Sequence, residues 1–535
     1  MQILFIDYID FIPIVFLYAE LHYYFKFTGS LYYLDEPEIL TDAPSFIEPN
    51  RKLPILLFIK DAHKYKLYLK SYKVIIYKNK NIIFEDIINI NRNINEHFWS
   101  KIELINLNNI FGKVTIQVFF DYDIDNIKKQ CITHNIPQSK KHYLDTIVMK
   151  EAYPRGNNVI YGDLHYHSSL TEDMVEYGAP LKETLIMAES MGLDFYCNTD
   201  HSYDLDDQIG SWTETDPELV KWKQSRKEIK NINKISNSFI IPSEELSLQN
   251  YKGQNIHALI LNNNTFIPGS GDGAEKIFNI KSEYNTNNVF KELEKNAICI
   301  AAHPFVSVSF LEKLFLNRGK WHKKDLANKN LLGLQIVNGK MDNDYFKSYK
   351  KWISLLLDGY KKYIYAGNDA HGNFNIYRQI KIPMISIKEK KEQIFGVYRT
   401  GVILNNKSNV LSAISSLKSG NCFVTNGPYI NMTILNNNKT YNMGSTILSK
   451  NASIYINIIS NSHFGKIKQL IIYQGDYNKK REYKRVILLN IDKYNFEYIY
   501  EYNISCNCYF RSFIMTETVH SKSFAISNPI WLEIS

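Results

Sequence analysis

Tyr161-Gly-Asp-Leu-His-Tyr-His167 is the stretch from which the fold and the site of this chain are predicted. Its two histidines stand one residue apart and follow the apolar pair Val159 and Ile160. Alternate residues of a strand share a face, so both imidazoles can point to the same side of a strand end. Neutral imidazole is a preferred ligand for zinc, iron and manganese. The stretch therefore predicts a strand that ends at a metal-binding edge.

The composition is that of a folded protein with more than one domain. The chain has 535 residues, 45% of them hydrophobic and 22% charged, which is too long for one ordinary core. Its net charge of +8 is modest and no block of Lys and Arg stands out, so we expect no specific nucleic-acid partner. Six cysteines in so long a chain do not make a disulfide framework and favour a reducing, cytoplasmic compartment.

The amino-terminal residues 1–18 are apolar, but they carry Asp7 and Asp10 and lack a basic segment. This pattern fits neither a signal peptide nor a membrane-spanning helix. We expect a pair of buried strands there and no association of the protein with a membrane.

Three regions of different pattern follow one another along the chain. Residues 1–150 and 428–535 show short apolar and aromatic runs broken by polar turns, which predict an N-terminal β domain and a small C-terminal β-sandwich. In residues 151–427 strands alternate with helices, which are expected over 180–191, 217–235, 287–295, 345–358 and 410–417. Such alternation predicts a parallel sheet of the α/β class, for which a closed barrel is one common solution.

Ligand-type side chains recur through this middle region, most of them at or near the end of an apolar run. They are His165, His167, Glu172 or Asp173, His201, Glu245 or Glu244, His257, His303, Asp369 and His371. Reactive groups of parallel βα folds collect where strands lead into loops at the carboxyl face. Buried imidazoles must all find hydrogen-bond partners, so packing alone is a poor explanation for six histidines in such positions.

Nine nitrogen and oxygen ligands exceed the needs of one ion, and they predict two or three divalent ions bridged by a carboxylate. The set contains no thiolate, which favours zinc, manganese or iron. Ions in such a cluster lower the pKa of a bridging water to about 7, supply hydroxide and hold the oxygens of the group under attack. This chemistry predicts a metal-dependent hydrolase.

The motif series resembles the PHP (polymerase and histidinol phosphatase) superfamily of metal-dependent hydrolases. The matching segments are Asp163-Leu-His-Tyr-His167, Thr199-Asp-His201, Pro242-Ser-Glu-Glu245, His257, His303-Pro304 and Asp369-Ala-His371. Gly162-Asp-Leu-His165, Arg399-Thr400 and Thr425-Asn-Gly-Pro428 are similar to the CehA/McbA-like branch. The resemblance implies a distorted (β/α)7-type barrel flanked by the two β-sandwich-like domains.

The resemblance also implies how the ligands are shared among the ions. One ion would be held by His165, His167, Glu245 and Asp369, a second by residue 172 with His201 and His371, and a third by His257 and His303 with Glu245 as the bridge. Glu172 stands where many members have Asp and is one methylene longer. Glu245 is preferred to Glu244 because it occupies the register of the family's glutamate.

The leading functional hypothesis is a phosphoesterase that acts on a small, phosphorylated ester. Asp200 would orient the ligand His201, and Arg399 would clamp a phosphoryl oxygen, unless Arg399 only makes a surface ion pair. The runner-up is hydrolysis of a carbamate or carboxylic ester at the same metal site. A third hypothesis is a non-catalytic binding protein that keeps the barrel. The sequence does not indicate an oligomeric state.

Overall fold

The computed structural model describes residues 19–20, 36–137, 139–171, 178–209, 211, 214–271, 281–308, 310–382, 386–405 and 407–534. Glu172, Asp173 and the strands predicted for residues 1–18 lie outside these residues.

Contacts divide the chain into two compact units. Unit 1 comprises Met1–Ala152, Ser168–Gly192 and Ala370–Phe395, and unit 2 comprises Tyr153–His167, Leu193–Asp369 and Gly396–Ser535. The three-part division at residues 150 and 427 stays a prediction.

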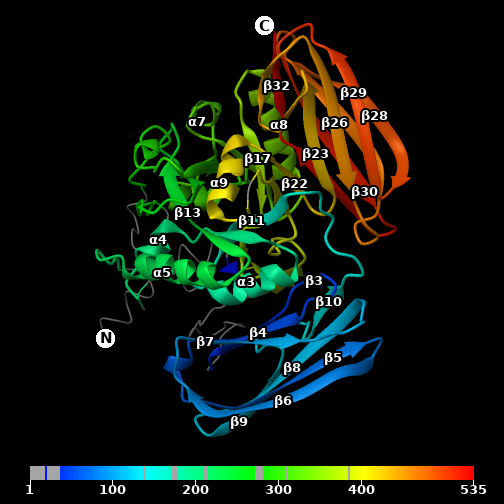
Figure 1. Cartoon of the computed structure of the whole chain (residues 1–535). Coiled ribbons are helices and arrows are strands. Elements are labelled where there is room, and N and C mark those ends of the chain that lie inside the picture. Colours follow the sequence, from blue (N-terminus) through cyan, green and yellow to red (C-terminus); the bar gives the residue numbers. More distant parts are fainter. Residues whose placement is uncertain are drawn as a thin grey trace. The chain divides into compact units, whose positions relative to one another are not determined.

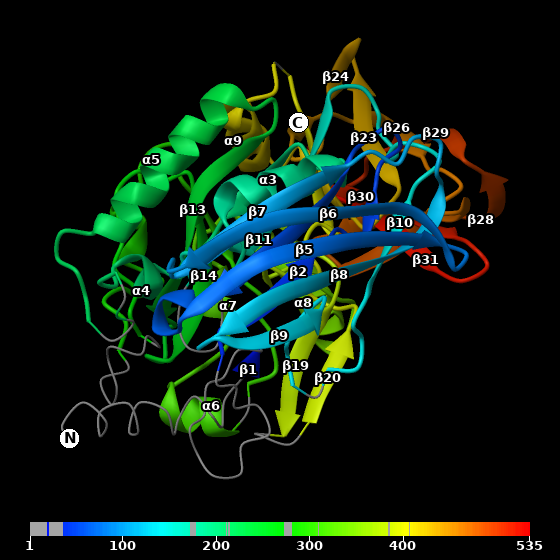
Figure 2. The same ribbon diagram turned by 90° about the horizontal axis from the view of Figure 1, so that it is seen from below.

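Unit 1 is built on two sheets that share one core. The larger has the order β3 (Phe46–Ile47), β10 (Leu144–Val148), β8 (Gly112–Ile124), β5 (Leu67–Lys78), β6 (Asn81–Ile94), with β9 (Ile127–Ile132) beside β8. The smaller has the order β2 (Glu38–Asp42), β4 (Leu53–Lys60), β7 (Phe98–Ile105). Figure 2 shows β5, β6 and β8 side by side. Leu57, Val74 and Val118, from both sheets, are buried in the same cluster, as in a β-sandwich.

Shorter elements complete unit 1. They are η1 (Ala62–Lys64), α3 (Leu181–Ser190), β18 (Ala370–His371) and a small sheet of β1 (Ala19–Glu20), β19 (Tyr377–Ile382) and β20 (Ser386–Lys390). Buried and half-buried residues alternate along most of β8 because successive side chains of a strand point to opposite faces. Only one face of this strand therefore meets the core.

Unit 2 is organised on one long sheet whose first strands follow the sequence. They are β11 (Val159–His167), β12 (Phe195–Asn198), β13 (Phe239–Gln249), β14 (Asn255–Leu261), β15 (Ile298–Ala301), β16 (Gly333–Asn338) and β17 (Tyr363–Gly367). β11, β12 and β13 run parallel, and so do β15, β16 and β17, whereas β14 is antiparallel to both of its neighbours. On its other side β11 pairs with β21 (Arg399–Ile403), which pairs with β22 (Cys422–Thr425). Figure 1 shows β11 close to β22.

The described helices of unit 2 are few, and some are very short. They are α4 (Ser202–Leu205), α5 (Val220–Ile235), α6 (Phe310–Phe315), α7 (Lys323–Leu326), α8 (Asn343–Leu357) and α9 (Val410–Ser419). The predicted helix over 287–295 is only the 3-10 turn η3 (Val289–Lys291). Within the described part of the chain, no helix combines the length and apolar character needed to cross a lipid bilayer.

The prediction of an α/β class with a distorted (β/α)7-type barrel is wrong. Strands make up 47% of the structure and helices 15%, so the protein is mostly β. The prediction failed first at β13 and β14, which are joined only by residues 250–254. A parallel neighbour needs a crossover of about a dozen residues or more, so this short connection forces an antiparallel hairpin.

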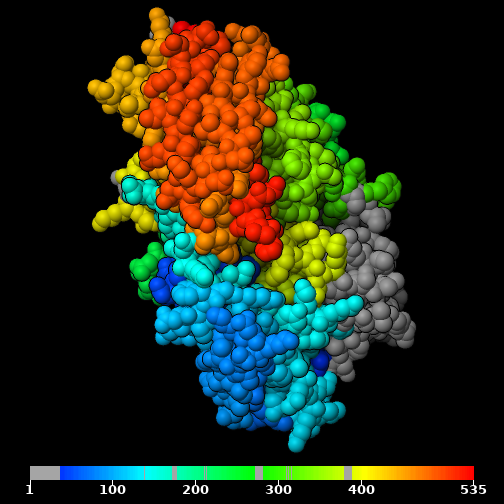
Figure 3. Space-filling view, turned by 90° about the vertical axis from the view of Figure 1, so that its right-hand side faces the viewer, coloured from blue at the N-terminus to red at the C-terminus, as the bar shows by residue number. Residues whose placement is uncertain are grey.

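The sheet of unit 2 continues into the carboxyl-terminal strands. Beyond β22 it runs through β31 (Lys522–Ser527), β30 (Cys508–Glu517), β27 (Lys466–Asp476) and β28 (Arg481–Lys493). A second sheet has the order β24 (Lys439–Tyr441), β23 (Tyr429–Asn436), β26 (Asn451–Ile459), β29 (Asn495–Asn503), and β25 (Thr446–Leu448) pairs with β32 (Ile530–Glu533). In Figure 3 this part of the chain, in orange, presents one broad surface.

Candidate metal centre

Seven of the predicted ligands lie in unit 2, on or just after strands of its long sheet. They are His165 and His167 of β11, His201 after β12, Glu245 of β13, His257 of β14, His303 after β15 and Asp369 after β17. Each has an ionisable atom within 3.5 Å of the carboxylate of Glu245 or of the ring nitrogens of His165 and His167. The structure therefore brings together side chains spread over some two hundred positions of sequence.

Four atoms form the tightest part of this cluster. Nε2 of His165 lies 3.1 Å from Nε2 of His167, 3.1 Å from Oδ1 of Asp369 and 3.2 Å from Oε2 of Glu245. Nε2 of His167 lies 3.3 Å from each of the two carboxylate oxygens. Four ligands around a tetrahedral zinc ion, each about 2.1 Å from the metal, stand about 3.4 Å from one another. These side chains are spaced to fit a common ion.

The hydrogen bond on the far side of the His165 ring also points to a cation. Nδ1 of His165 lies 3.0 Å from Oε1 of Gln335, whose Nε2 donates to Oδ1 of Asn338. An amide oxygen only accepts, so Nδ1 carries the proton. The neutral ring would then face two carboxylate oxygens with the lone pair of Nε2. That arrangement is repulsive unless a proton or a metal ion lies between them.

The two oxygens of Glu245 face different sets of imidazoles. Oε2 faces His165 and His167 and is 3.2 Å from Nδ1 of His201. Oε1 is 2.8 Å from Nδ1 of His257 and 3.0 Å from Nε2 of His303. One carboxylate is thus placed to connect two ion positions, one on each side of it.

The charges of the cluster are strongly coupled. Burial opposes protonation of both His165 and His167, but Asp369 and Glu245 raise the pKa of each to about 9. Despite burial, the surrounding imidazoles hold the pKa of Glu245 well below its usual range, and the same is true of Asp369. The site therefore attracts positive charge into the protein interior.

The backbone at the open side of the cluster is unusual. The side chains of His303 and Asp369 are 13% and 18% exposed, against 0% for His165 and His167. Both of the partly exposed residues have positive φ angles, 23° and 52°, a region that few non-glycine residues adopt. Such backbone conformations cluster at functional sites. The cluster is therefore reached by solvent on the side of His303 and Asp369.

Gly367 allows β17 to approach β11 closely. A Cβ atom at this position would lie 2.5 Å from Cβ and 2.7 Å from the backbone nitrogen of His165. Two residues further on, the N–H of Asp369 donates to the carbonyl of His165 at 2.9 Å. The absence of a side chain here thus sets the distance between the two ligands.

Glu244 and Asp200 do not face this cluster with their side chains. Glu244 points away from it, 3.5 Å from the hydroxyl of Ser202. The Asp200 carboxylate accepts from Nδ2 of Asn198 at 2.6 Å, and its carbonyl accepts from the N–H of Glu245 at 3.0 Å. Asp200 thus positions the strand of Glu245, while its orienting role toward His201 stays a prediction.

The remaining three assignments also stay predictions. Arg399 is 0% exposed, donates from Nε to the carbonyl of Gly396 and lies 3.9 Å over the ring of Tyr153, which favours packing over a surface ion pair or a phosphate clamp. His371 belongs to unit 1. Glu172 is not among the described residues.

The structure adds three side chains that sequence reasoning missed. Gln335 orients His165, and Asn338 donates from Nδ2 to Oδ2 of Asp369 at 2.9 Å. Nη1 of Arg318 lies 2.6 Å from Nε2 of His257. Gln335 and Asn338 could have been found as the polar residues of β16, whereas nothing in the sequence around Arg318 indicates its neighbour.

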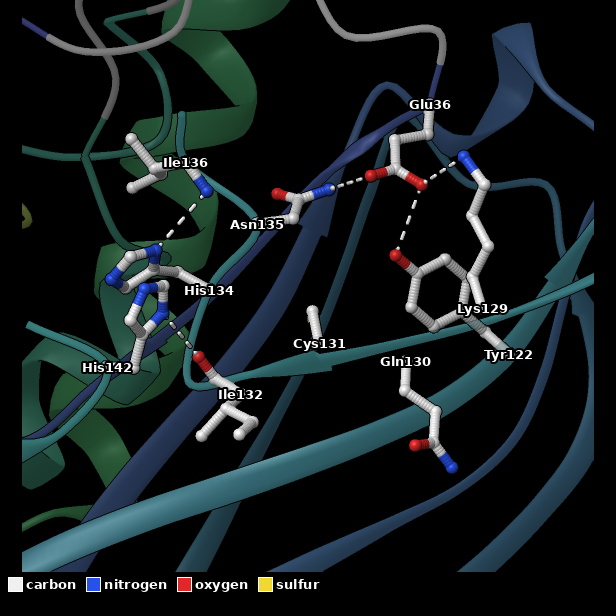
Figure 4. A pocket seen from close by; sticks show the side chains of 10 residues that line it. All are labelled: Glu36, Tyr122, Lys129, Gln130, Cys131, Ile132, His134, Asn135, Ile136 and His142. Atoms are coloured by element: carbon white, nitrogen blue, oxygen red, sulfur yellow. Dashed lines mark hydrogen bonds and ion pairs between the residues drawn. The ribbon is translucent and has the colours of Figure 1, made fainter. Parts of the chain in front are cut away.

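A cavity in unit 1 shows what ordinary packing of histidine looks like (Figure 4). It has a volume of about 480 Å³ and is lined in part by Glu36, His134 and His142. Nδ1 of His134 accepts from the N–H of Ile136, and Nε2 lies 2.8 Å from the carbonyl of Lys141. Burial lowers the pKa of His134 to about 3. Both ring nitrogens of a neutral His134 therefore have suitable hydrogen-bond partners. In contrast, Nε2 of a neutral His165 would face carboxylate oxygens with its lone pair.

Comparisons with known proteins do not name a relative. No family model matches the sequence, and neither does any curated protein. Among solved structures, the chain is weakly similar to a cycloisomaltooligosaccharide glucanotransferase from Paenibacillus sp., with 9% identity, 92% of this chain and 71% of that chain covered, and a TM-score of 0.19. It is also weakly similar to Salmonella alpha-2-macroglobulin, with 8% identity, coverage of 97% and 24%, and a TM-score of 0.14. Scores this low carry no argument.

Proposed function

We propose that this protein is a metal-dependent hydrolase, and specifically a phosphoesterase, that holds two or three divalent ions such as zinc, manganese or iron. The proposal rests on the convergence of Nε2 of His165 and His167 with one oxygen each of Glu245 and Asp369. The resemblance of the motifs to the PHP superfamily supports it. Bound ions would supply a nucleophilic water and draw electrons from the ester.

The protein's own residues fix the geometry of this chemistry. Glu245 would hold an ion on each oxygen, with His165 and His167 on one side and His257 and His303 on the other. Gln335 turns Nε2 of His165 toward its ion because it accepts the Nδ1 proton. Ligands on strands are held more rigidly than ligands on loops, which suits a reaction that depends on position.

Arg318 favours an anionic substrate. Arg318 is partly exposed as a residue, and its guanidinium lies beside His257. A guanidinium stays charged at any ordinary pH and binds two phosphate oxygens at once. We propose that it binds the phosphoryl group of a small-molecule ester, the role that the sequence suggested for Arg399.

The test combines metal analysis with a substrate panel. Purified protein should carry about two or more transition-metal ions per chain and hydrolyse an aryl phosphate monoester or diester, with inhibition by phosphate. His165→Ala or Asp369→Ala should remove the metal together with the activity. Arg318→Met should leave the metal content unchanged and raise KM by about tenfold, because a charge-assisted hydrogen bond is lost.

The other outcomes separate the competing functions. Cleavage of an aryl carboxylic ester or carbamate, with both phosphate substrates intact, would favour the runner-up. Full metal occupancy without any turnover would favour a binding protein, and protein without metal would refute the proposal. We also propose a reducing, cytoplasmic location, because all six cysteines are free.

A further inference from the structure

A second group of imidazoles and a carboxylate lies in unit 1, at the end of β4. Asp61, His63 and His97 each offer one ligand atom, and these atoms lie within 4.8 Å of one another. Nε2 of His97 is 3.1 Å from Oδ1 of Asp61, and the two imidazole rings are 4.7 Å apart. The group shares no residue with the Glu245 cluster.

The pairing of two strands builds this group. β4 and β7 are antiparallel, and Lys60 and Phe98 are the last pair of their ladder. Asp61 and His97 therefore stand opposite each other just beyond the ladder, where the N–H of Asp61 donates to the carbonyl of His97 at 2.7 Å. Asp61 has a φ of 60° and begins the turn η1, which carries His63 back toward His97.

A cation already lies at the carboxylate. Nζ of Lys64 is 3.1 Å from Oδ1 of Asp61, and the lysine side chain is 56% exposed, whereas that of Asp61 is 7% exposed. The lysine side of this ion pair is exposed and flexible, so another cation can displace Lys64 from the carboxylate. A carboxylate so well buried, with two imidazoles beside it, is better satisfied by a divalent ion than by a flexible lysine.

We propose that Asp61, His63 and His97 form a separate binding site for one borderline divalent cation such as zinc. Two imidazoles and one carboxylate are zinc ligands, whereas magnesium prefers oxygen ligands alone. The ion joins the turn η1 to the start of β7 and so stabilises this end of the β2–β4–β7 sheet. It is a structural site and takes no part in the proposed hydrolysis.

Histidine modification by diethyl pyrocarbonate tests the proposal on the full chain. Peptides that contain His63 and His97 are followed by mass spectrometry with zinc, with magnesium and without added metal. Zinc should slow the modification of both histidines by about tenfold and magnesium should not, because a ligated nitrogen cannot react. His520, exposed and outside both clusters, is the control and should react at one rate throughout. Equal rates for His63 and His97 with and without zinc would overturn the proposal.

Two variants should shift the zinc concentration for half-protection of the histidines in opposite directions. A turn that binds no metal would not respond in this way. Lys64→Gln removes the competing positive charge and should lower the zinc concentration for half-protection by about fivefold. Asp61→Asn should raise that concentration by at least about tenfold, because a carboxylate ligand is lost. The same half-protection in both variants as in the natural protein would overturn the proposal. His165→Ala should leave it unchanged, so this result is independent of the Glu245 cluster.

Discussion

The Glu245 cluster of unit 2 and the Asp61 group of unit 1 combine the same kinds of side chain in opposite surroundings. In the first, His165 and His167 are fully buried on a strand, and ligands from six strand segments meet. In the second, His63 is exposed on a turn, and all three residues lie within forty positions of sequence. The first is assembled by six strands of one long sheet, and the second by one pair of strands and the turn η1.

This difference predicts how much each site depends on single residues. Removing a partner from a buried, charged group leaves the remaining charges without compensation, which costs several kcal/mol. Exposed groups exchange their partners for water at little cost. Substitutions in the Glu245 cluster should therefore have large effects, and those of His63 and His97 in the Asp61 group small ones.

The largest effect is expected for Glu245→Gln, with Glu244→Gln as the matched control. Glu245→Gln removes the charge that faces five imidazoles and should lower both metal content and kcat/KM by more than about a hundredfold. Burial raises the pKa of Glu244 to about 8, so this side chain is already mostly neutral at pH 7 and tolerates Gln. Metal analysis and kinetics check this prediction. Equal losses in the two variants would contradict the assignment of Glu245.

The next effect concerns Gln335, which touches no ion itself. Gln335→Leu leaves Nδ1 of His165 without its acceptor and should weaken metal binding by about 10- to 100-fold. Gln335→Glu keeps an acceptor and should retain more of the affinity. Competition with a chelator of known affinity measures both. Unchanged binding in Gln335→Leu would mean that the orientation of His165 has another cause.

A smaller effect is expected when the pH of the metal-free protein is raised. The pKa of His165 and of His167 is raised to about 9, so their pairing with the carboxylates is fully present below about pH 6.5 and is lost as the pH rises through about 9. The Tm of metal-depleted protein should fall over this range. Zinc should remove most of the fall, because it replaces the protons. Calorimetry with zinc and with chelator compares the two slopes, and identical slopes would contradict the coupling.

The smallest effect is expected for His63→Ala and His97→Ala. Hydrolysis should be unchanged, because the Asp61 group belongs to the other unit. Zinc at ten times its Kd adds about 1.4 kcal/mol to the free energy of unfolding of a protein that binds it. In the His63→Ala and His97→Ala variants, zinc should not raise the free energy of unfolding of unit 1 by this amount. In His520→Ala it should. Denaturant unfolding with and without zinc measures the difference.

The local elements were largely predictable from the pattern of the sequence. The helix expected over 345–358 is found as α8 (Asn343–Leu357), where Asp342 caps the amino terminus by accepting from the N–H groups of Asp344 and Tyr345. The helix expected over 410–417 is found as α9 (Val410–Ser419). Periodicity and capping are local properties, which is why they can be read without the fold.

The fold class was not predictable in the same way. The direction of β14, which the predicted parallel sheet had wrong, decides where His257 lies. His257 stands near the amino end of β14, so in an all-parallel sheet it would lie at the edge opposite to the other ligands. Because β14 is antiparallel, His257 lies across from Ser247, beside Glu245. The short connection at residues 250–254 was the signal that excluded a parallel strand.

By itself, the sequence singled out the candidate ligands: imidazoles and carboxylates placed where apolar runs end. Motif register favoured Glu245 over Glu244, but only the tertiary structure shows the Glu245 carboxylate beside the imidazoles, since neighbouring residues of a strand face opposite sides and the register depends on distant partners. The tertiary structure also decided that Gln335 and Arg318 belong to the site. Such neighbours are brought together by long-range pairing of strands, which no local pattern records.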